Sequence, residues 1–181
     1  MTAAGGSGQQ LARRVGRLIR EVPDFPLPGV LFQDIMPLLA DGPTLAAVVD
    51  HIVEVHRPAG FEVVAGIEAR GFLLAAPVAY AADCGVVAIR KAGKLPGPSV
   101  SASYDLEYGA AVMELQRADL GPGQRVLLVD DVLATGGTLA AALALLESAG
   151  AVIAGVAVLV ELSEFAGRDR LPVNVEALLV V

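Results

Sequence analysis

Residues 125–137 of this 181-residue chain read Arg-Val-Leu-Leu-Val-Asp-Asp-Val-Leu-Ala-Thr-Gly-Gly, and this stretch decides the fold class. Residues 126–129 are a short run of valine and leucine, which is typical of a strand covered on both faces in a parallel sheet. The strand is expected to stop at Asp130. Thr138 then opens an apolar helix, predicted over residues 138–149. The stretch therefore predicts a strand, a short loop and a helix in direct succession.

The loop of this unit has the composition of an anion site. Residues 135–138 are Thr-Gly-Gly-Thr, which offer hydroxyls and unhindered backbone N–H groups where the helix begins, and a helix start attracts anions such as phosphate. The carboxylates of Asp130 and Asp131 repel phosphate, so they are expected to bind sugar hydroxyls, Mg²⁺, or both. Taken singly, each piece is more often a solvated turn or a capped loop. Together they indicate a phosphorylated sugar, and neither the ATP-type nor the dinucleotide-type glycine loop is present.

The rest of the chain predicts an α/β fold with a mainly parallel sheet, because strand and helix patterns alternate. Strands are expected at residues 62–67, 86–89, 126–129 and 152–161, and helices at 10–22, 43–57, 72–84 and 138–149. Ligands of such sheets lie at the carboxyl ends of the strands. Residues 68–71, Arg90 and Asp130 fall at those ends, so we expect them to converge on one crevice.

A stretch rich in Pro, Gly and Ser covers residues 90–109 and predicts a structureless loop that closes as a lid. It contains the only two lysines of the chain, Lys91 and Lys94, next to Arg90. Three cations within five residues of an acidic protein suit a pyrophosphate group. The alternative is an ordinary solvated basic turn.

Composition limits the partners of the protein. The net charge of −7 argues against nucleic acid, and no membrane-spanning segment is expected. Residues 1–10 are expected to be a disordered tail without a signal peptide, followed by a single domain over residues 11–181 in a cytoplasmic protein. The lone Cys84 is expected in the core, and His51 and His56 on a helix surface, with no protein metal site.

Five segments together resemble the type I phosphoribosyltransferase family, and within it the adenine-specific members. They are residues 23–35 (Pro-Asp-Phe-Pro-Leu-Pro-Gly-Val-Leu-Phe-Gln-Asp-Ile), 68–72 (Glu-Ala-Arg-Gly-Phe), 90–97 (Arg-Lys-Ala-Gly-Lys-Leu-Pro-Gly), 103–109 (Ser-Tyr-Asp-Leu-Glu-Tyr-Gly) and 125–137. The resemblance implies the type I phosphoribosyltransferase fold with a small base-binding hood. It also implies the transfer of phosphoribose from phosphoribosyl pyrophosphate (PRPP) to adenine, giving AMP and pyrophosphate for purine salvage, with Mg²⁺ bound mainly through PRPP and a homodimer.

The same resemblance implies the site residues. Glu107, Asp130 and Asp131 would be catalytic, with Glu107 as acid/base on the purine. PRPP would be bound by Ala69, Arg70, Arg90, Lys91, Lys94, Asp130, Asp131, Ala134, Thr135, Gly136, Gly137 and Thr138. Adenine would be bound by Leu31, Phe32 and Gln33, with Phe32 stacking on the base; without the resemblance, Phe32 reads as a core residue.

This chain departs from the family pattern at two of these positions. Gln33 stands where a basic residue is common, and Ala69 where serine is common. Gln33 removes a charge near the base, which leaves the partner of Glu107 open. Two alternatives remain: a 6-oxopurine phosphoribosyltransferase, which commonly uses a lysine in the C-terminal half, where this chain has none after Lys94, and a PRPP-binding regulator without catalysis.

Overall fold

A computed structural model describes residues 4–106 and 109–181. The chain divides into an N-terminal unit that ends at His51 and a C-terminal unit that begins at Ile52. The expectation of one domain over residues 11–181 stays a prediction. In the part of the chain that the structure describes, no helix is long and apolar enough to cross a membrane.

The N-terminal unit contains a helix, a two-stranded ribbon and two further helices. These are α1 (Ala4–Leu18), β1 (Arg20–Pro23), β2 (Leu31–Asp34), α2 (Met36–Ala40) and α3 (Gly42–His56), whose last turn lies past the unit boundary. Strands β1 and β2 are antiparallel and pair Arg20 with Asp34. The two side chains also form an ion pair of 2.5 Å. The helix expected over residues 10–22 is therefore wrong at its end, because residues 20–22 pair with β2.

Helix α1 also begins earlier than expected, at Ala4. Residues 1–10 were expected to form a disordered tail, and that expectation stays a prediction. A helix that has already formed adds residues without a second nucleation step. Glycine costs only about 1 kcal/mol relative to alanine there, so the downstream helix can extend through this glycine-rich segment.

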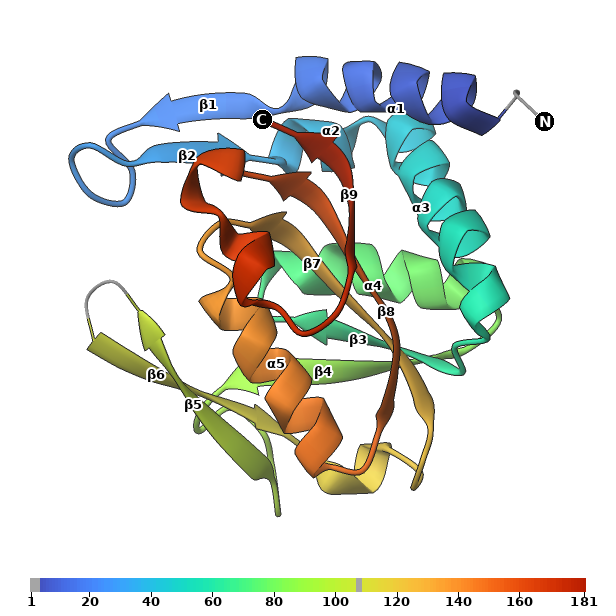
Figure 1. Ribbon diagram of the computed structural model, residues 1–181, viewed down its shortest axis with the longest axis vertical. Coiled ribbons are helices and arrows are strands. Elements are labelled where there is room, and N and C mark those ends of the chain that lie inside the picture. The colour runs from blue at the N-terminus through green and yellow to red at the C-terminus, as the bar shows by residue number, and fades with distance from the viewer. Residues whose placement is uncertain (1–3, 107–108) are drawn as a thin grey trace. The chain divides into compact units, whose positions relative to one another are not determined.

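The C-terminal unit is built on one seven-stranded sheet of order β5-β6-β4-β3-β7-β8-β9 (Figure 1). Its strands are β3 (Val63–Ile67), β4 (Gly85–Lys91), β5 (Val100–Leu106), β6 (Gly109–Leu115), β7 (Arg125–Leu133), β8 (Val152–Glu161) and β9 (Val175–Val180). Neighbouring strands are parallel along the series β4, β3, β7, β8 and β9. Strands β5 and β6 pair antiparallel with each other, and β6 pairs antiparallel with β4. The mainly parallel sheet predicted from the sequence is confirmed.

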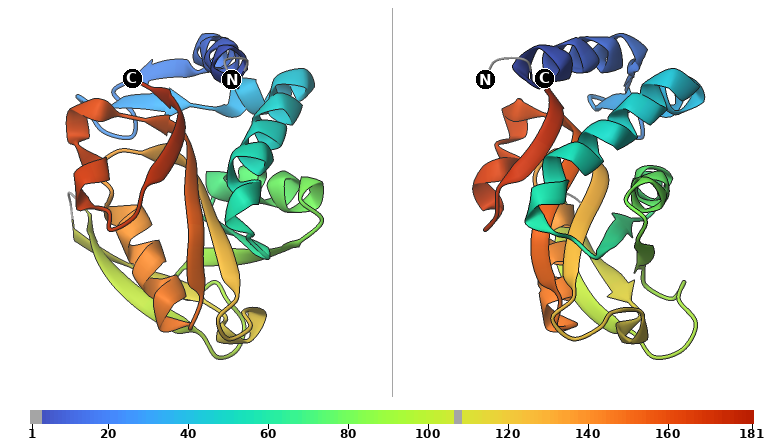
Figure 2. Two further views of the ribbon diagram at one scale, coloured as in Figure 1. Left: turned by 45° about the vertical axis from the view of Figure 1, so that its right-hand side comes forward. Right: turned by 90° about the vertical axis from the view of Figure 1, so that its right-hand side faces the viewer.

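Two helices cover opposite faces of this sheet. Helix α4 (Arg70–Ala81) joins β3 to β4, and α5 (Gly137–Ser148) joins β7 to β8. The first connection moves toward one edge of the sheet and the second toward the other. Because such connections are right-handed, the two helices must lie on opposite faces, as Figures 1 and 2 show. Besides the last turn of α3, the other helical segments of this unit in the described residues are short 3₁₀ turns at Arg57–Ala59, Arg117–Asp119, Ser163–Phe165 and Gly167–Arg170.

The main core lies between the sheet and α5. Leu139, Leu143 and Leu146 of α5 are at most 2% exposed and belong to the same buried cluster as Val126 and Leu128 of β7. Burial of each leucine contributes about 1.5–3 kcal/mol. This packing fixes the start of α5 against the end of β7, where the predicted phosphate loop lies.

Strand β7 is longer than the sequence indicated. It continues past Asp130 to Leu133, because β8 still pairs with it there: Val132 lies opposite Val160. Only the pairing with β3 ends at Val129. The expected stop at Asp130 is therefore wrong.

Residues 90–109 also differ from the expected structureless loop. Strand β4 reaches Lys91, and β5 and β6 form an antiparallel hairpin. Among the residues of this segment that the structure describes, only residues 92–99 therefore lie outside the strands. The hairpin extends the sheet, because Arg90 pairs with Glu114 of β6.

His56 was expected on a helix surface and is instead buried, 9% exposed. It fits because β8 carries Gly155 opposite it: a Cβ at that position would lie 2.5 Å from His56 Nδ1. Cys84, expected in the core, is only half-buried.

Candidate active site

The ends of β3, β4 and β7 surround a cavity of about 340 Å³ in the C-terminal unit. Among its lining residues are these predicted PRPP-binding residues: Ala69, Arg70, Arg90, Lys91, Asp130, Asp131, Ala134 and Thr138. Segments from three different strands thus meet at the carboxyl edge of the sheet, as expected for ligand sites in parallel sheets. The peptide bond between Glu68 and Ala69 at this edge is cis.

Asp130 and Asp131 are buried at the end of β7, 7% and 5% exposed. Asp130 Oδ1 accepts the backbone N–H of Asp131 at 2.9 Å, and Asp131 Oδ2 pairs with Arg70 Nε at 2.7 Å. Burial, reinforced by the charge of Asp131, raises the pKa of Asp130 well above its usual value. Burial also raises the pKa of Asp131, although the Arg70 charge opposes this shift. The site therefore keeps two carboxyl groups at a free-energy cost, which is typical of functional positions.

A glycine lets α4 approach these carboxyl groups closely. A Cβ on Gly71 would lie 2.8 Å from Asp130 Oδ1 and 2.9 Å from the Val129 carbonyl oxygen. Gly71 therefore permits the first turn of α4, which carries Arg70, to rest on the end of β7. The resemblance included Gly71 in a motif but gave it no such role.

Replacement of Asp130 by asparagine is expected to stabilise the protein at neutral pH while impairing its function. The folded-state pKa of Asp130 is raised, so its contribution to stability is fully present below the unfolded carboxyl pKa of about 3.9 and is lost as the pH rises through the folded pKa. Asparagine avoids that loss and its Oδ1 can still accept the Asp131 N–H.

Thermal unfolding of Asp130→Asn and of the parent, compared at pH 4 and pH 7.5, tests this expectation. The variant should be more stable than the parent at pH 7.5, because the neutral amide avoids the cost of a buried charge. The gain should shrink at pH 4. A variant that is less stable at pH 7.5 would show that the Asp130 charge is well compensated in the folded protein.

The predicted phosphate loop, residues 134–138, connects β7 to α5. Gly136 has a left-handed backbone with φ 82°, and α5 starts at Gly137, one residue before the predicted start. No side chain caps this helix start. Its first backbone N–H groups therefore remain suited to bind an anion.

The segment around Gly167 packs against this phosphate loop. A Cβ on Gly136 would lie 2.5 Å from the Gly167 carbonyl oxygen, and a Cβ on Gly167 would overlap the carbonyl oxygen of Ala134. The two glycines thus allow backbone-to-backbone contact. Arg168, next to Gly167, forms an ion pair with Glu161 at the end of β8 and donates to the Val175 carbonyl oxygen. This contact could not be predicted from the sequence, since Gly167 lies 30 residues from the motif.

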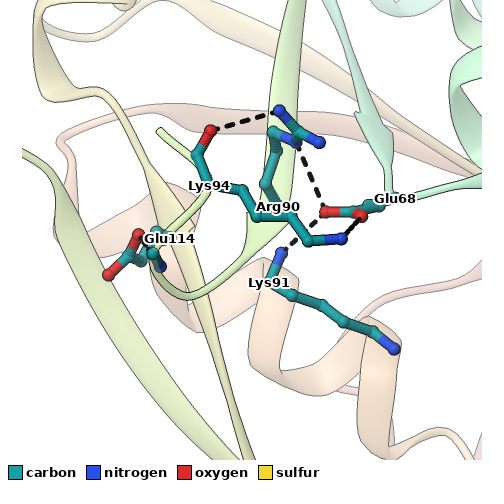
Figure 3. Close-up of polar contacts among 6 residues, drawn as sticks. Glu68, Arg90, Lys91, Lys94 and Glu114 are labelled. Atoms are coloured by element: carbon teal, nitrogen blue, oxygen red, sulfur yellow. Dashed lines mark hydrogen bonds and ion pairs between the residues drawn. The ribbon is translucent and has the colours of Figure 1, made fainter. Parts of the chain in front are cut away.

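Two of the three predicted pyrophosphate cations, Arg90 and Lys94, contact Glu68 through their side chains, whereas the Lys91 side chain points away from it (Figure 3). Glu68 Oε2 accepts from Arg90 Nε at 3.3 Å and from the backbone N–H of Lys91 at 3.0 Å, and Glu68 Oε1 pairs with Lys94 Nζ. Glu68 was expected at this crevice with residues 68–71, but it was given no binding or catalytic role of its own. Lys94 is brought close to the cavity through this contact although it does not line it.

The structure does not test the remaining predicted site residues, Glu107, Leu31, Phe32 and Gln33. Glu107 lies outside the described residues, so its role stays a prediction. Leu31, Phe32 and Gln33 belong to β2 in the N-terminal unit. Phe32 packs edge-on against Phe25, with ring centroids 5.0 Å apart, and Leu31 is 49% exposed. Adenine binding by these three residues also stays a prediction.

Comparison with known proteins identifies the class. The family model described as "Phosphoribosyl transferase domain" matches residues 37–175, which contain the sheet, the carboxylate pair and the phosphate loop. The chain belongs to the phosphoribosyltransferase family. This confirms the fold class that the sequence resemblance implied.

Within this family, the similar proteins are adenine phosphoribosyltransferases. The adenine phosphoribosyltransferase of Salinispora arenicola is 55% identical over 178 residues, 98% of this chain and 95% of the relative. The solved adenine phosphoribosyltransferase of Rhodothermus marinus has a TM-score of 0.91 at 41% identity, covering 96% and 99% of the two chains. That of Saccharomyces cerevisiae, solved with an imino-altritol bisphosphate and adenine, has a TM-score of 0.89 at 34% identity, covering 94% and 99%. The resemblance to the adenine-specific members is confirmed.

Proposed function

We propose that this protein is an adenine phosphoribosyltransferase, which converts adenine and PRPP to AMP and pyrophosphate in purine salvage. The observation that carries the proposal is the arrangement at the end of β7. There two buried carboxyl groups are followed, two residues further on, by a glycine loop and a helix start, and Arg90 and Lys94 lie nearby. The identity of 55% to an enzyme of that name supports adenine as the base.

The reaction replaces one bond at the anomeric carbon of the ribose by another. The bond to pyrophosphate breaks with its electron pair leaving on the phosphate oxygen, and the bond to the purine ring nitrogen forms. Positive charge develops on the ribose and negative charge on the leaving group. Each needs stabilisation by groups already in position, because these contribute most when they need no reorganisation.

The described residues supply both acidic groups for the ribose and basic groups for the pyrophosphate. Residues 134–138 would hold the 5′-phosphate on backbone N–H groups at the start of α5. Asp130 and Asp131 would accept hydrogen bonds from the ribose hydroxyls and stabilise its developing positive charge. Arg70, Arg90 and Lys94 would bind the leaving pyrophosphate, which is a role suited to cations that already line or adjoin the cavity. Lys91 and Ala69 would contribute at the same edge.

The base side of the site rests on the family resemblance. Phe32 would stack on adenine, with Leu31 and Gln33 beside it, and Glu107 would accept the proton that the purine nitrogen loses. Gln33 carries no charge, so Glu107 would act without a basic neighbour at that position. No lysine follows Lys94, which disfavours a 6-oxopurine substrate.

Mg²⁺ fits this site as a substrate-bound ion. Among the described residues no group of three or more His, Cys, Asp or Glu side chains could hold a metal. Mg²⁺ commonly binds one or two carboxylates together with substrate phosphates, and Asp130 and Asp131 could supply such a carboxylate beside PRPP. When bound, the ion would neutralise charge on the pyrophosphate. A homodimer and a cytoplasmic location remain family-based parts of the proposal.

A base panel tests the proposal. Purified protein with PRPP and MgCl₂ is given adenine, hypoxanthine or guanine, and nucleotide formation is followed by chromatography. We expect AMP from adenine, and kcat/KM for the two 6-oxopurines lower by about 10³-fold or more, since a mismatched polar group leaves buried partners unpaired. Comparable rates with hypoxanthine or guanine would contradict the assignment to adenine.

A further inference from the structure

Glu68 occupies the centre of the cation cluster beside the cavity. Its side chain is only 10% exposed, and it contacts three donors: Arg90 Nε at 3.3 Å, the Lys91 N–H at 3.0 Å, and Lys94 Nζ (Figure 3). The carboxylate thus holds the place that an external anion would take. The Glu68 backbone is fixed by the sheet, since its N–H donates to the Ile89 carbonyl oxygen at 2.9 Å.

The charge state of Glu68 agrees with these contacts. Burial alone would raise the pKa of Glu68, but the hydrogen bonds from Lys94 and the Lys91 N–H, together with the charges of Lys94 and Arg90, outweigh it and lower the pKa. Glu68 is therefore ionised at neutral pH and neutralises part of the positive charge around it.

We propose that Glu68 is a positioning residue whose carboxylate holds Arg90, Lys94 and the Lys91 N–H when no pyrophosphate group is bound and is displaced from them when one binds. This inference rests on the proposed function. A pyrophosphate group carries more charge than one carboxylate and offers more acceptor oxygens, so it can replace Glu68 on these donors. The exchange lowers affinity for pyrophosphate, which assists its release as a product, and keeps the cations ordered between turnovers.

The turn that carries Lys94 has other anchors, so Glu68 is not needed to fold it. Arg90 Nη1 donates to the Lys94 carbonyl oxygen at 3.1 Å, and Glu114 accepts the Gly93 N–H at 2.9 Å. Gln116 donates to the Pro96 carbonyl oxygen. Removing the Glu68 charge should therefore free the cations without unfolding the turn.

Calorimetric titration with pyrophosphate and MgCl₂ at fixed ionic strength tests the proposal on the parent, Glu68→Gln and Glu114→Gln. Glutamine keeps the size of Glu68 and removes its charge. We expect Glu68→Gln to bind pyrophosphate about three- to tenfold more tightly, the scale of two partly exposed ion pairs. Glu114→Gln removes a charge on β6 that contacts the same turn through the Gly93 N–H, without contacting the Arg90 or Lys94 side-chain nitrogens, and its affinity should stay within about twofold of the parent.

A double-mutant cycle with Lys94→Gln separates displacement from a general charge effect. Lys94 must leave Glu68 to bind pyrophosphate, so Lys94→Gln should cost less affinity in the parent than in the Glu68→Gln background. Equal costs, or a Glu68→Gln affinity that is unchanged or weaker, would overturn the proposal while leaving the proposed function intact. A parent protein that binds neither pyrophosphate nor PRPP would instead overturn the proposed function, and this inference with it.

Discussion

Replacement of Asp131 by asparagine is expected to lower kcat for AMP formation by about 10²- to 10³-fold, the scale for losing one electrostatic contact to a transition state. Asp131 is 5% exposed at the end of β7 and carries the carboxylate expected to face the developing positive charge of the ribose. Asparagine keeps its shape and loses its charge. Steady-state kinetics with adenine and PRPP measure the effect.

The fold should survive this change. The ion pair between Asp131 and Arg70 is lost, but Arg70 keeps 31% of its side chain exposed, so the cost should stay below the 3–5 kcal/mol of a fully buried pair. Glu62→Gln is the matched control. The Glu62 carboxylate accepts the Arg125 N–H at 2.8 Å, at the opposite end of β7 from Asp131. Loss of the Glu62 charge should change kcat by no more than about twofold. Near-parent turnover by Asp131→Asn would refute the catalytic role of this carboxylate.

The largest loss is expected for Glu107→Gln. By family resemblance Glu107 accepts the purine proton, and glutamine keeps the shape but cannot act as a base. We expect kcat to fall by about 10²- to 10⁴-fold, the usual range for general acid–base catalysis. PRPP affinity, measured by calorimetry without adenine, should remain within about threefold of the parent, because the lost interaction belongs to the reacting base.

The two measurements on Glu107 distinguish its possible roles. A loss of turnover with unchanged PRPP binding assigns Glu107 to the base. If PRPP binding weakens as much as turnover, Glu107 belongs to the pyrophosphate or metal site, and the base would have to be sought near Gln33.

The central strands of the sheet, and the edge at which the candidate site lies, could be predicted because each strand is encoded by a short continuous run of residues. Runs of apolar residues gave β3, β4, β7 and β8, and β8 was predicted with its observed bounds of Val152–Glu161. Because ligands lie at the carboxyl ends of parallel strands, Arg70, Arg90 and Asp130 were then predicted to lie around one site. The cavity between the strands bears out that convergence.

The hairpin of β5 and β6 was missed although a signal was present. Apolar residues alternate with polar ones at 100–106, which is a strand pattern, but the proline, glycine and serine content of the surrounding segment outweighed it. The continuation of β7 past Asp130 could not be predicted from the neighbouring residues, because pairing of Asp130 with Val158 of β8 keeps the chain extended there.

Other features depend on contacts between distant residues. The approach of Gly167 to Ala134, the space that Gly155 leaves for His56, and the position of Glu68 among the cations all require the folded chain. Asp130 and Asp131 were predicted as site residues, but their burial and raised pKa values became apparent only with α4 packed against β7.

Phosphorus NMR of a single reaction tests the central claim most directly. Purified protein is mixed with PRPP, MgCl₂ and adenine, and the signals of PRPP, AMP and pyrophosphate are followed together. We expect each PRPP consumed to give one AMP and one pyrophosphate, with no consumption when adenine is omitted. PRPP that binds to the protein but persists unchanged in the presence of adenine would contradict the account and indicate a PRPP-binding protein without transferase activity.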